Sequence, residues 1–386
     1  MKLDGAPVLP ALAHDGVVRA DQARDQLVAL LPTPVPSNHA PCLLPLPGGD
    51  LLAVWFGGSD EGNPDICLWS SRLEHGSGTW TPAEQLTDDP DRSDQNPALF
   101  AAPDGAVWLL YPSQLARRPD REETFNLQHT AEVRRMVSRD GGRTWSAPEV
   151  FLDRPGTFLR QPPQVLASGR WVLPTWVSTD DGNKNGSDVT VVHLSDDEGE
   201  TWRAVEVPDS AGCVHANVVE LAPDRLVALF RSRYADHVYL ATSEDGGETW
   251  SRPSPTELPN NNSSITALRL PSGRLGVVCN DLGFNSGRTQ VFWPFERPSV
   301  TLAASDDAGR TFAWRRVVEV GDGFTGRANL RANRRHEYPG LAVDADGHLH
   351  VTYAHESRRC IKHVVVTEAW LDGQAQVLDG DCKLWS

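Results

Sequence analysis

Six segments of this chain repeat one pattern, in which a polar residue precedes an apolar strand, a Gly or Asp turn and a second apolar strand. The copies are HAPCLLPLPGGDLLAVWF, NPALFAAPDGAVWLLYPS, QPPQVLASGRWVLPTWV, HANVVELAPDRLVALFRS, SITALRLPSGRLGVVCND and YPGLAVDADGHLHVTYAH. Their turns fall near Gly49, Gly105, Gly169, Asp224, Gly273 and Gly347. A spacing of about 50 to 75 residues suits four strands plus loops, the content of one propeller blade. The sequence therefore predicts an all-β fold, a six-bladed β-propeller, with residues 1–386 as a single domain.

The N-terminal segment, residues 1–35, is left over from this count. We expect it to supply a strand to the last blade and close the ring, because closure removes exposed sheet edges. The composition agrees with a fold of short strands: 13 Trp, 32 Gly and 29 Pro occur in the chain, but only two Met. Without a long apolar segment of helical period, helices are predicted to be minor.

The formal net charge of -16 argues against nucleic acid and anionic membrane surfaces as partners. It leaves a small anionic substrate open, since a site can be locally basic. The six Cys have neither CxxC nor Cys/His ligand spacing, so the sequence predicts no disulfide framework and no zinc site. No cofactor is predicted, and the metal requirement stays open. The N-terminus lacks a long apolar run, which predicts a cytoplasmic protein without a membrane span; a secreted protein whose signal peptide has been removed has the same pattern. Oligomeric state stays open.

A second motif follows several of the hairpins. It reads SRDGGRTW (138–145), SDDEGETW (195–202), SEDGGETW (243–250) and SDDAGRTF (305–312). Asp and Ser side chains bond backbone N–H groups in such turns, Gly adopts a positive φ, and the aromatic residue packs beneath. We predict structural turns between the third and fourth strands of a blade, without a catalytic role for their Asp residues.

The first strand of each blade lies nearest the propeller axis, so polar residues that begin these strands should converge there. Because ligand sites in propellers sit at one mouth, this arrangement predicts a shared polar pocket. Arg231 ends the strand antiparallel to the one that His215 begins, and should return to the same mouth. Aligning the hairpins on their turns puts these residues at one level: His39, Asn96, Arg160 or Gln161, His215, Ser264 and Tyr338.

The S-x-D-x-G-x-T-W repeats in a six-hairpin chain resemble the Asp-box repeats of the sialidase (neuraminidase) superfamily. In that family three Arg bind the substrate carboxylate, a Tyr is the nucleophile, a Glu polarises it and an Asp is the general acid/base. A neutral Tyr suits this substrate because an anionic nucleophile would be repelled by the sugar carboxylate. The resemblance implies an exo-acting glycoside hydrolase that removes a terminal acidic sugar, such as sialic acid or a related ulosonic acid.

Carried over residue by residue, the resemblance implies roles for four positions. The stretch FGGSDEGNPDICLWSSR resembles the acid/base loop, with Asp60 as the acid/base and Glu61 and Asp65 as nearby rivals. LVALFRSR and ERPSVTLAASDDAGRTF resemble the second and third carboxylate-binding segments. HEYPGLAVDADG resembles the segment that carries the nucleophile. The remaining roles fall on Arg231, Arg297 and, for the nucleophile, Tyr338.

Two positions depart from the family pattern. His39, in NHAP, stands where the first substrate-binding Arg is expected, and His215 stands where the activating Glu is expected. We expect His215 to act as the base toward Tyr338, since imidazole titrates near 6.5 and phenol near 10. Arg160 and His39 would join Arg231 and Arg297 around the carboxylate. HAPCLLPLPGGDLLAVWFGGSDEGNPDICLW and EYPGLAVDADGHLHVTYAHESRRCIKHVV resemble a branch of sialidase-like BNR-repeat proteins.

Other polar residues near the predicted pocket are candidate sugar contacts. The Asn run 260–262, and Asn262 in particular, either reads sugar hydroxyls or forms an Asn-rich turn. A basic run before Tyr338 is expected to attract an anionic sugar; it contains Arg327, Arg331, Arg334 and Arg335. The substrate-binding candidates are completed by Asn96, Gln161, Glu61 and Asp65.

Two other functions use the same residues. A His and a Tyr beside an Arg-neutralised carboxylate can abstract the proton α to a uronate, which would make the protein a lyase. The loss of two family residues instead favours a non-catalytic carbohydrate-binding propeller.

Overall fold

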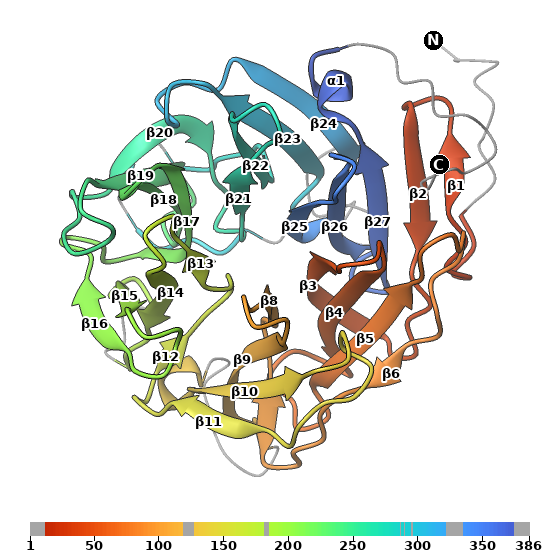
Figure 1. Cartoon of the computed structure of the whole chain (residues 1–386), viewed down its shortest axis with the longest axis horizontal. Coiled ribbons are helices and arrows are strands. Elements are labelled where there is room, and N and C mark those ends of the chain that lie inside the picture. Colours follow the sequence, from red (N-terminus) through yellow and green to blue (C-terminus); the bar gives the residue numbers. More distant parts are fainter. Residues whose placement is uncertain are drawn as a thin grey trace.

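The computed structural model of the chain describes residues 12–118, 127–180, 185–285, 287–288, 290–294, 296–321 and 335–373. Figure 1 looks down an axis around which six sheets are arranged as blades, with antiparallel pairing between neighbouring strands in each sheet. The predicted all-β six-bladed propeller is confirmed. Within the described ranges, two short helices accompany the strands, η1 (Gln128–Thr130) and α1 (Glu368–Leu371).

Each hairpin of the sequence supplies the inner two strands of one blade. Blade 1 contains β3 (Ser37–Pro45), β4 (Leu51–Gly58), β5 (Cys67–Leu73) and β6 (Glu84–Gln85). In blade 2, β7 (Arg92–Asp94) and β8 (Ala98–Ala101) both pair with β9 (Val107–Leu115), followed by β10 (Glu132–Ser138) and β11 (Glu149–Leu152). In blade 3, β12 (Thr157–Phe158) and β13 (Gln164–Val165) pair with β14 (Trp171–Val177), followed by β15 (Val189–Ser195) and β16 (Arg203–Glu206).

The other half of the ring has the same order from the axis outward. Blade 4 contains β17 (Cys213–Ala222), β18 (Arg225–Ser232), β19 (His237–Ser243) and β20 (Ser254–Pro259). Blade 5 contains β21 (Thr266–Arg269), β22 (Leu275–Cys279), β23 (Ser299–Ser305) and β24 (Trp314–Val320). Blade 6 has five strands: β25 (Glu337–Val343), β26 (Leu349–His355), β27 (Cys360–Val366), β2 (Gln26–Leu30) and β1 (Arg19–Asp21).

The N-terminal segment lies on the outer side of blade 6. β2 pairs antiparallel with β27, from Leu27 opposite Val365 to Leu30 opposite Lys362. The chain before β1 then crosses to blade 1, where Trp80 N donates to Gly16 O at 3.0 Å. Gly16 has φ +73°, and a Cβ there would lie 2.9 Å from the Trp80 carbonyl oxygen, so the close approach requires glycine. The first and last parts of the chain are thereby packed together.

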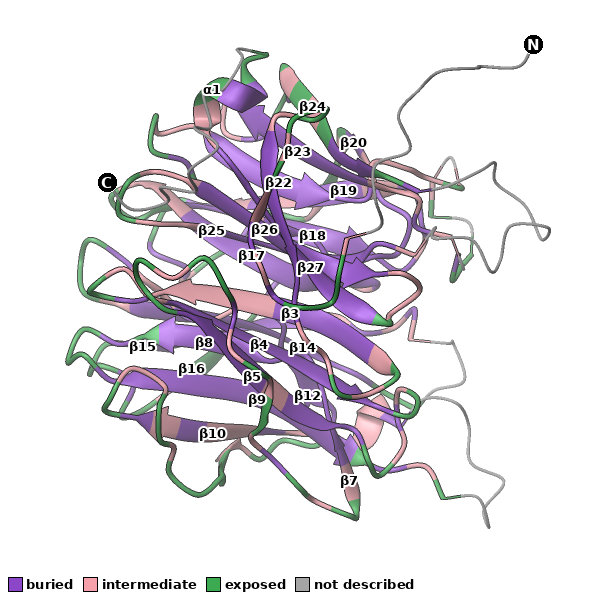
Figure 2. Ribbon diagram, turned by 90° about the vertical axis from the view of Figure 1, so that its right-hand side faces the viewer, coloured by how far each residue is buried: buried purple, intermediate pink, exposed green. Residues whose placement is uncertain are grey.

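Apolar side chains between neighbouring blades form the core. Strand interiors are buried and the turns at both ends are exposed, as Figure 2 shows. One cluster joins blades 5 and 6 through Val278, Leu302, Val351 and Val364, and comparable clusters separate the other blades. No helix in the described part of the chain has the length and apolar character needed to cross a membrane.

The four Asp-box turns lie where the sequence places them, between the third and fourth strands of blades 2 to 5. In the first, Asp140 accepts bonds from the Ser138 hydroxyl at 2.7 Å and from the Thr144 N–H at 2.9 Å. Asp197, Asp245 and Asp307 repeat this pattern. These carboxylates are bound within their own turns, which confirms a structural interpretation of the motif.

Candidate active site

The inner strands of several blades contain a bulge at one common level. In β17 the register jumps between Val214, opposite Arg231, and Asn217, opposite Leu229; β25 shows the same shift after Glu337. A bulge re-aims side chains, here toward the propeller axis. Asn96 (φ 41°), His215 (φ 52°) and Tyr338 (φ 51°) share the left-handed backbone that this geometry requires.

In blade 1 the equivalent residue is Ala40 (φ 49°), not His39. The β3 register shift begins at His39, which is opposite Phe56, so His39 matches Glu337 rather than Tyr338. The predicted ring is therefore wrong by one residue in this blade. Because alternate residues of a strand face opposite sides, a one-residue slip changes where the side chain points.

Tyr338 lies among cationic and aromatic side chains and is buried. Its hydroxyl accepts a hydrogen bond of 2.5 Å from Arg231 NH1. The guanidinium carbons of Arg231 and Arg297 lie 5.2 and 5.4 Å from the centroid of the tyrosine ring. The rings of His39 and His215 lie 4.2 and 5.5 Å from it, the latter edge-on. The two guanidinium groups make the surroundings of the phenol electropositive, and the structure thus brings five predicted site residues together.

Arg231 is held by hydrogen bonds from two sides, and one of its donor groups has no acceptor in the described part of the chain. Its Nε donates to Asn262 Oδ1 at 2.8 Å, and its NH1 also faces His215 Nε2 at 3.1 Å. Burial, together with Arg233 and Arg297, lowers the pKa of Arg231 to about 9, which leaves the guanidinium charged at neutral pH. Its buried NH2 group has no acceptor among the residues that the structure describes. A buried cationic donor in this state is suited to an incoming anion.

His215 is fixed as a neutral imidazole. Arginine is only a donor, so His215 Nε2 must accept from Arg231, and the ring proton lies on Nδ1, which donates to Ser264 Oγ at 3.1 Å. The ring stacks on Trp176 at 4.3 Å between centroids. Burial, reinforced by Arg231 and neighbouring guanidinium groups, holds the pKa of His215 well below its usual range. Arg231 therefore bridges His215 and Tyr338, and both ring nitrogens of His215 are engaged by Arg231 and Ser264 rather than by the phenol.

Glu337 is a buried carboxylate that the sequence analysis missed. Three arginines surround it: Arg297 NH1 and Arg335 NH2 lie 3.0 Å from Oε1, and Arg358 Nε donates to Oε2. We call Glu337 with these arginines the Glu337 cage. Burial alone would raise the pKa of Glu337, but Arg358, Arg297 and Arg335 together hold it well below its usual range. Its place directly before Tyr338 in HEYPG is the sequence feature that could have identified it.

Arg358 supplies a guanidinium beside His39. Its NH2 lies 3.4 Å from His39 Nε2, and its NH1 forms a 2.8 Å ion pair with Glu61. The residue belongs to the turn between β26 and β27, where Glu356, Ser357 and Arg358 all have positive φ. The sequence contains two adjacent arginines here, and only the curl of the turn directs Arg358 inward while Arg359 is exposed. Arg358 thus places a permanent positive charge beside His39.

The predicted acid/base loop follows β4 at the same end of the blade as His39, since Gly58 pairs with Ser37. Its three carboxylates differ in their contacts. Asp60 is 65% exposed and forms a 3.1 Å ion pair with Arg117, whereas Glu61 is joined to the Glu337 cage through Arg358. Asp65 accepts from the N–H and hydroxyl of Ser59, both at 2.8 Å. Asp65 therefore shapes the loop, and Asp60 and Glu61 remain open to an incoming group.

Arg160 and Gln161 face the central channel below Tyr338. Arg160 NH2 donates to the backbone carbonyls of Pro41 and Tyr338 at 2.8 and 3.4 Å, and its NH1 donates to Pro97 O at 3.3 Å. Gln161 Nε2 donates to a blade 5 carbonyl, and both side chains line the channel cavity. The guanidinium predicted to bind substrate instead ties together the bulged strands of three blades, because strand carbonyls freed by the bulges need donors.

The other predicted polar residues are engaged within the protein or fall outside the described part. Asn262 uses its side chain on Arg231 and on the Phe292 carbonyl, and its backbone carbonyl accepts from Arg297 at 3.1 Å. Asn96 is buried in its bulge. Of the basic run, Arg335 belongs to the Glu337 cage, while Arg327, Arg331 and Arg334 lie outside the described residues. Guanidinium groups outnumber carboxylates around Tyr338, so the site is basic within an acidic protein.

The six blades, the Asp-box turns and a buried Tyr–Arg site at one end of the axis define a sialidase-like β-propeller. The chain belongs to the BNR repeat-like domain family, whose sequence profile matches residues 49–351.

The chain is similar to several proteins named as sialidases. The chain is 27% identical over 321 residues to a sialidase of Micromonospora viridifaciens, a match that covers 74% of this chain and 47% of that relative. It therefore spans about half the length of this relative. A Hadza microbial sialidase superposes with a TM-score of 0.67 at 17% identity, over 86% of this chain and 66% of that one. The Ruminococcus gnavus intramolecular trans-sialidase gives 0.65 at 14% identity, over 96% and 100%. These structural likenesses show a common fold.

Proposed function

We propose that this protein is a sialidase-type glycosidase that removes a terminal carboxylated sugar, with Tyr338 as the nucleophile. The observation that carries the proposal is the bond from Arg231 NH1 to the Tyr338 hydroxyl, next to an Arg231 NH2 group without an acceptor among the described residues. The same guanidinium can thus stabilise a phenolate and receive a carboxylate. The sialidase names of the relatives support this reaction class.

In the proposed reaction the Tyr338 oxygen forms a bond to the anomeric carbon as the glycosidic C–O bond breaks. The phenol proton passes to solvent, because the neutral His215 already accepts from Arg231. A carboxylate nucleophile would be repelled by the sugar carboxylate, whereas the phenol is neutral until it reacts. Arg231 and Arg297, both near the Tyr338 ring, stabilise the developing negative charge. Water then attacks the anomeric carbon: its hydroxyl bonds to the sugar as the sugar–tyrosine bond breaks, and its proton restores the Tyr338 phenol.

The leaving-group oxygen needs a proton, which we assign to Asp60. Asp60 is an exposed carboxylate of the loop at the mouth of blade 1, and unlike Asp65 its side chain is not bonded to Ser59 of the same loop. Glu61 is the competing candidate, because its bond to Arg358 joins it to the Glu337 cage. Replacing the acid should reduce kcat by about 10²- to 10⁴-fold. Asp60→Asn and Glu61→Gln, assayed side by side, assign the role to the variant with the larger loss.

We assign the sugar carboxylate to Arg231, with Arg297 and Arg358 as its cationic neighbours. Arg297 and Arg358 also hold Glu337, so they are pre-oriented before substrate arrives. Arg358, beside His39, takes the place of the guanidinium that the family carries at the start of the first blade. His39 contacts the Tyr338 ring, so we assign it to shaping the pocket.

Aryl glycosides of sialic acid and related ulosonic acids test the proposal. The wild-type protein should release the aryl alcohol, and Tyr338→Phe should abolish turnover while leaving the thermal unfolding transition in place. Tyr111→Phe is the matched control, because Tyr111 is a buried tyrosine on β9 of blade 2 and lies outside the contacts described for Arg231 and Glu337. No turnover on any glycoside of the panel would refute the proposal.

The same panel separates the other functions. Saccharide binding that is unchanged by Tyr338→Phe and yields no product would make the protein a binding propeller. An unsaturated uronate released from a uronic-acid polysaccharide would make it a lyase.

A further inference from the structure

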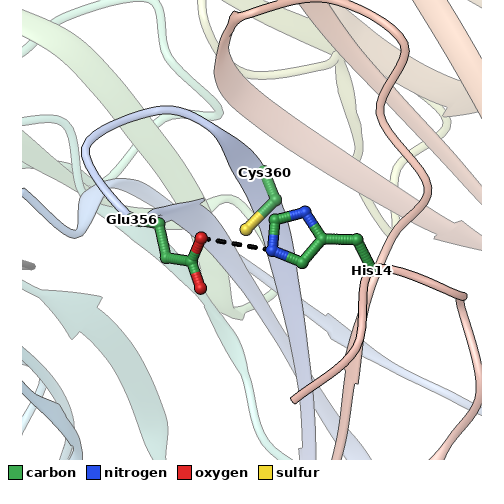
Figure 3. A group of neighbouring side chains, drawn as sticks. All are labelled: His14, Glu356 and Cys360. Atoms are coloured by element: carbon green, nitrogen blue, oxygen red, sulfur yellow. Dashed lines mark hydrogen bonds and ion pairs between the residues drawn. The ribbon is translucent and has the colours of Figure 1, made fainter. Parts of the chain in front are cut away.

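A second group of reactive side chains lies away from Tyr338, where the N-terminal segment meets the turn between β26 and β27. Figure 3 shows His14, Glu356 and Cys360 pointing toward one another from these two segments. Their ligand atoms, one each of nitrogen, oxygen and sulfur, all lie within 4.8 Å of one another. His14 Nε2 is 3.1 Å from Glu356 Oε2.

The fold explains how residues so far apart in the sequence meet. β26 and β27 pair as far as His355 opposite Cys360, and the turn beyond them curls because Glu356, Ser357 and Arg358 have φ of 49°, 57° and 74°. The curl brings the Glu356 carboxylate over the Cys360 thiol. His14 arrives with the segment that crosses from blade 6 to blade 1. The N-terminal segment and the β26–β27 turn are therefore both positioned by the contacts that close the propeller ring.

The donor set selects for one kind of ion. Zinc takes thiolate, imidazole and carboxylate ligands at about 2.0–2.3 Å, which puts tetrahedral ligand atoms about 3.3–3.7 Å apart. The three ligand atoms lie within 4.8 Å of one another, so zinc binding requires them to move closer together. Magnesium and calcium prefer oxygen ligands alone, so the sulfur and nitrogen atoms argue against them. His14 and Glu356 are 35% and 30% exposed, which gives an ion a path from solvent and leaves a fourth position for water.

We propose that His14, Glu356 and Cys360 bind one Zn²⁺ ion with water as the fourth ligand. Binding releases the thiol proton of Cys360 to solvent, since the thiolate is the ligand. The ion fastens the N-terminal segment to the turn whose next residues carry Arg358 to the Glu337 cage. Zinc would thus link the N-terminal segment to the turn between β26 and β27, and the ion pairs of Arg358 link the same turn to Glu337 and Glu61.

Cobalt titration of the whole protein tests this site directly. Co²⁺ substitutes for zinc and gives a near-ultraviolet charge-transfer band when a thiolate binds it. We expect one equivalent of Co²⁺, the charge-transfer band, and loss of the band on addition of Zn²⁺. A hundredfold excess of Zn²⁺ over its Kd should raise the Tm by a few degrees Celsius. Cys360→Ser should remove the band, and His14→Ala should weaken binding at least tenfold.

Variants of other cysteines test whether the cobalt band comes from Cys360. Cys42→Ser is the control among the described cysteines, as it is a partly exposed thiol in blade 1. Cys382→Ser removes the terminal thiol, which lies outside the described residues, and both variants should retain the band. If Cys360→Ser does not fold, His14→Ala and Glu356→Gln, whose side chains are partly exposed, carry the test. A missing band in the wild type, or a band and zinc-induced Tm shift unaffected by these two variants, overturns the proposal.

Discussion

Replacing Glu337 with Gln should destabilise the protein more than any other single loss of charge near Tyr338. The carboxylate is buried and faces Arg297, Arg335 and Arg358, with His39 Nδ1 at 3.6 Å from Oε2. Gln keeps the shape of the side chain but removes its charge. It also turns an amide N–H₂ toward guanidinium donors, so the three cations lose their shared counter-ion.

The expected loss follows from that geometry. Removing one partner of a buried ion pair costs about 3–5 kcal/mol, because the other charge stays buried and uncompensated. In the variant, Arg358 still has Glu61 as a counter-ion, and the partly exposed Arg335 is still in contact with water. The charges of these two arginines therefore remain partly compensated. Arg297 is the buried cation that loses its carboxylate altogether. We therefore expect a decrease of about 3 kcal/mol in the free energy of unfolding.

Urea unfolding followed by fluorescence of the thirteen tryptophans measures this difference. The midpoint of Glu337→Gln should fall by about 1 M with an unchanged slope. Glu61→Gln is the control: its carboxylate is 25% exposed and forms one arginine ion pair of the cage, so its loss should cost about 1 kcal/mol or less. Equal midpoints for Glu337→Gln and the wild type would refute the assignment of Glu337 as the counter-ion.

The acid limb of the stability curve gives a second readout of the same residue. The folded-state pKa of Glu337 is lowered, so its stabilisation is complete above the unfolded value near 4.5 and is lost as the pH falls toward the folded value. Glu337→Gln should lack this component. The difference in free energy of unfolding between wild type and variant should therefore shrink below pH 4.5.

Three further predictions rest on other contacts. Arg231→Lys should lower kcat/KM by about ten- to a hundredfold on a cleaved sialoside, since one ammonium cannot serve Asn262, the phenol and a carboxylate together, whereas Arg225→Lys on the surface should match the wild type. Asp245→Ala should lower the free energy of unfolding by about 1 kcal/mol and leave kcat unchanged, because its bonds stay within an Asp-box turn; a large loss of kcat would contradict that. Stability should fall below pH 6.5, by about 1.4 kcal/mol per pH unit for each buried histidine that stays neutral in the fold, such as His363, whose pKa burial and then His350 hold well below its usual range. A flat urea midpoint between pH 6.5 and 5 would contradict it.

The number of blades and the nature of the turns were readable from the chain itself, because both depend on short-range patterns. Six hairpins recur with their own turn residues, and a Ser–Asp–Gly turn completes its hydrogen bonds within one motif. The alignment that placed Asn96, His215 and Tyr338 at one level also succeeded, since all three share the same bulge and left-handed backbone. The same alignment failed for His39, because a bulge shifts register by one residue without a mark in the hydrophobic pattern.

Contacts between blades were decided by the tertiary structure. The position of Arg160 before a strand predicted a substrate-binding residue. In the structure, its guanidinium donates to backbone carbonyls of bulged strands from other blades. Arg358 and Arg359 are adjacent and chemically identical, and the curl of one turn determines which of them reaches Glu337. The spacing of cysteines and histidines indicated no zinc ligands, whereas ring closure brings His14 to Cys360. The sequence repeats determine the strands, because pairing within a hairpin is local. The charged residues near the axis come from separate blades, so their contacts depend on how the ring closes.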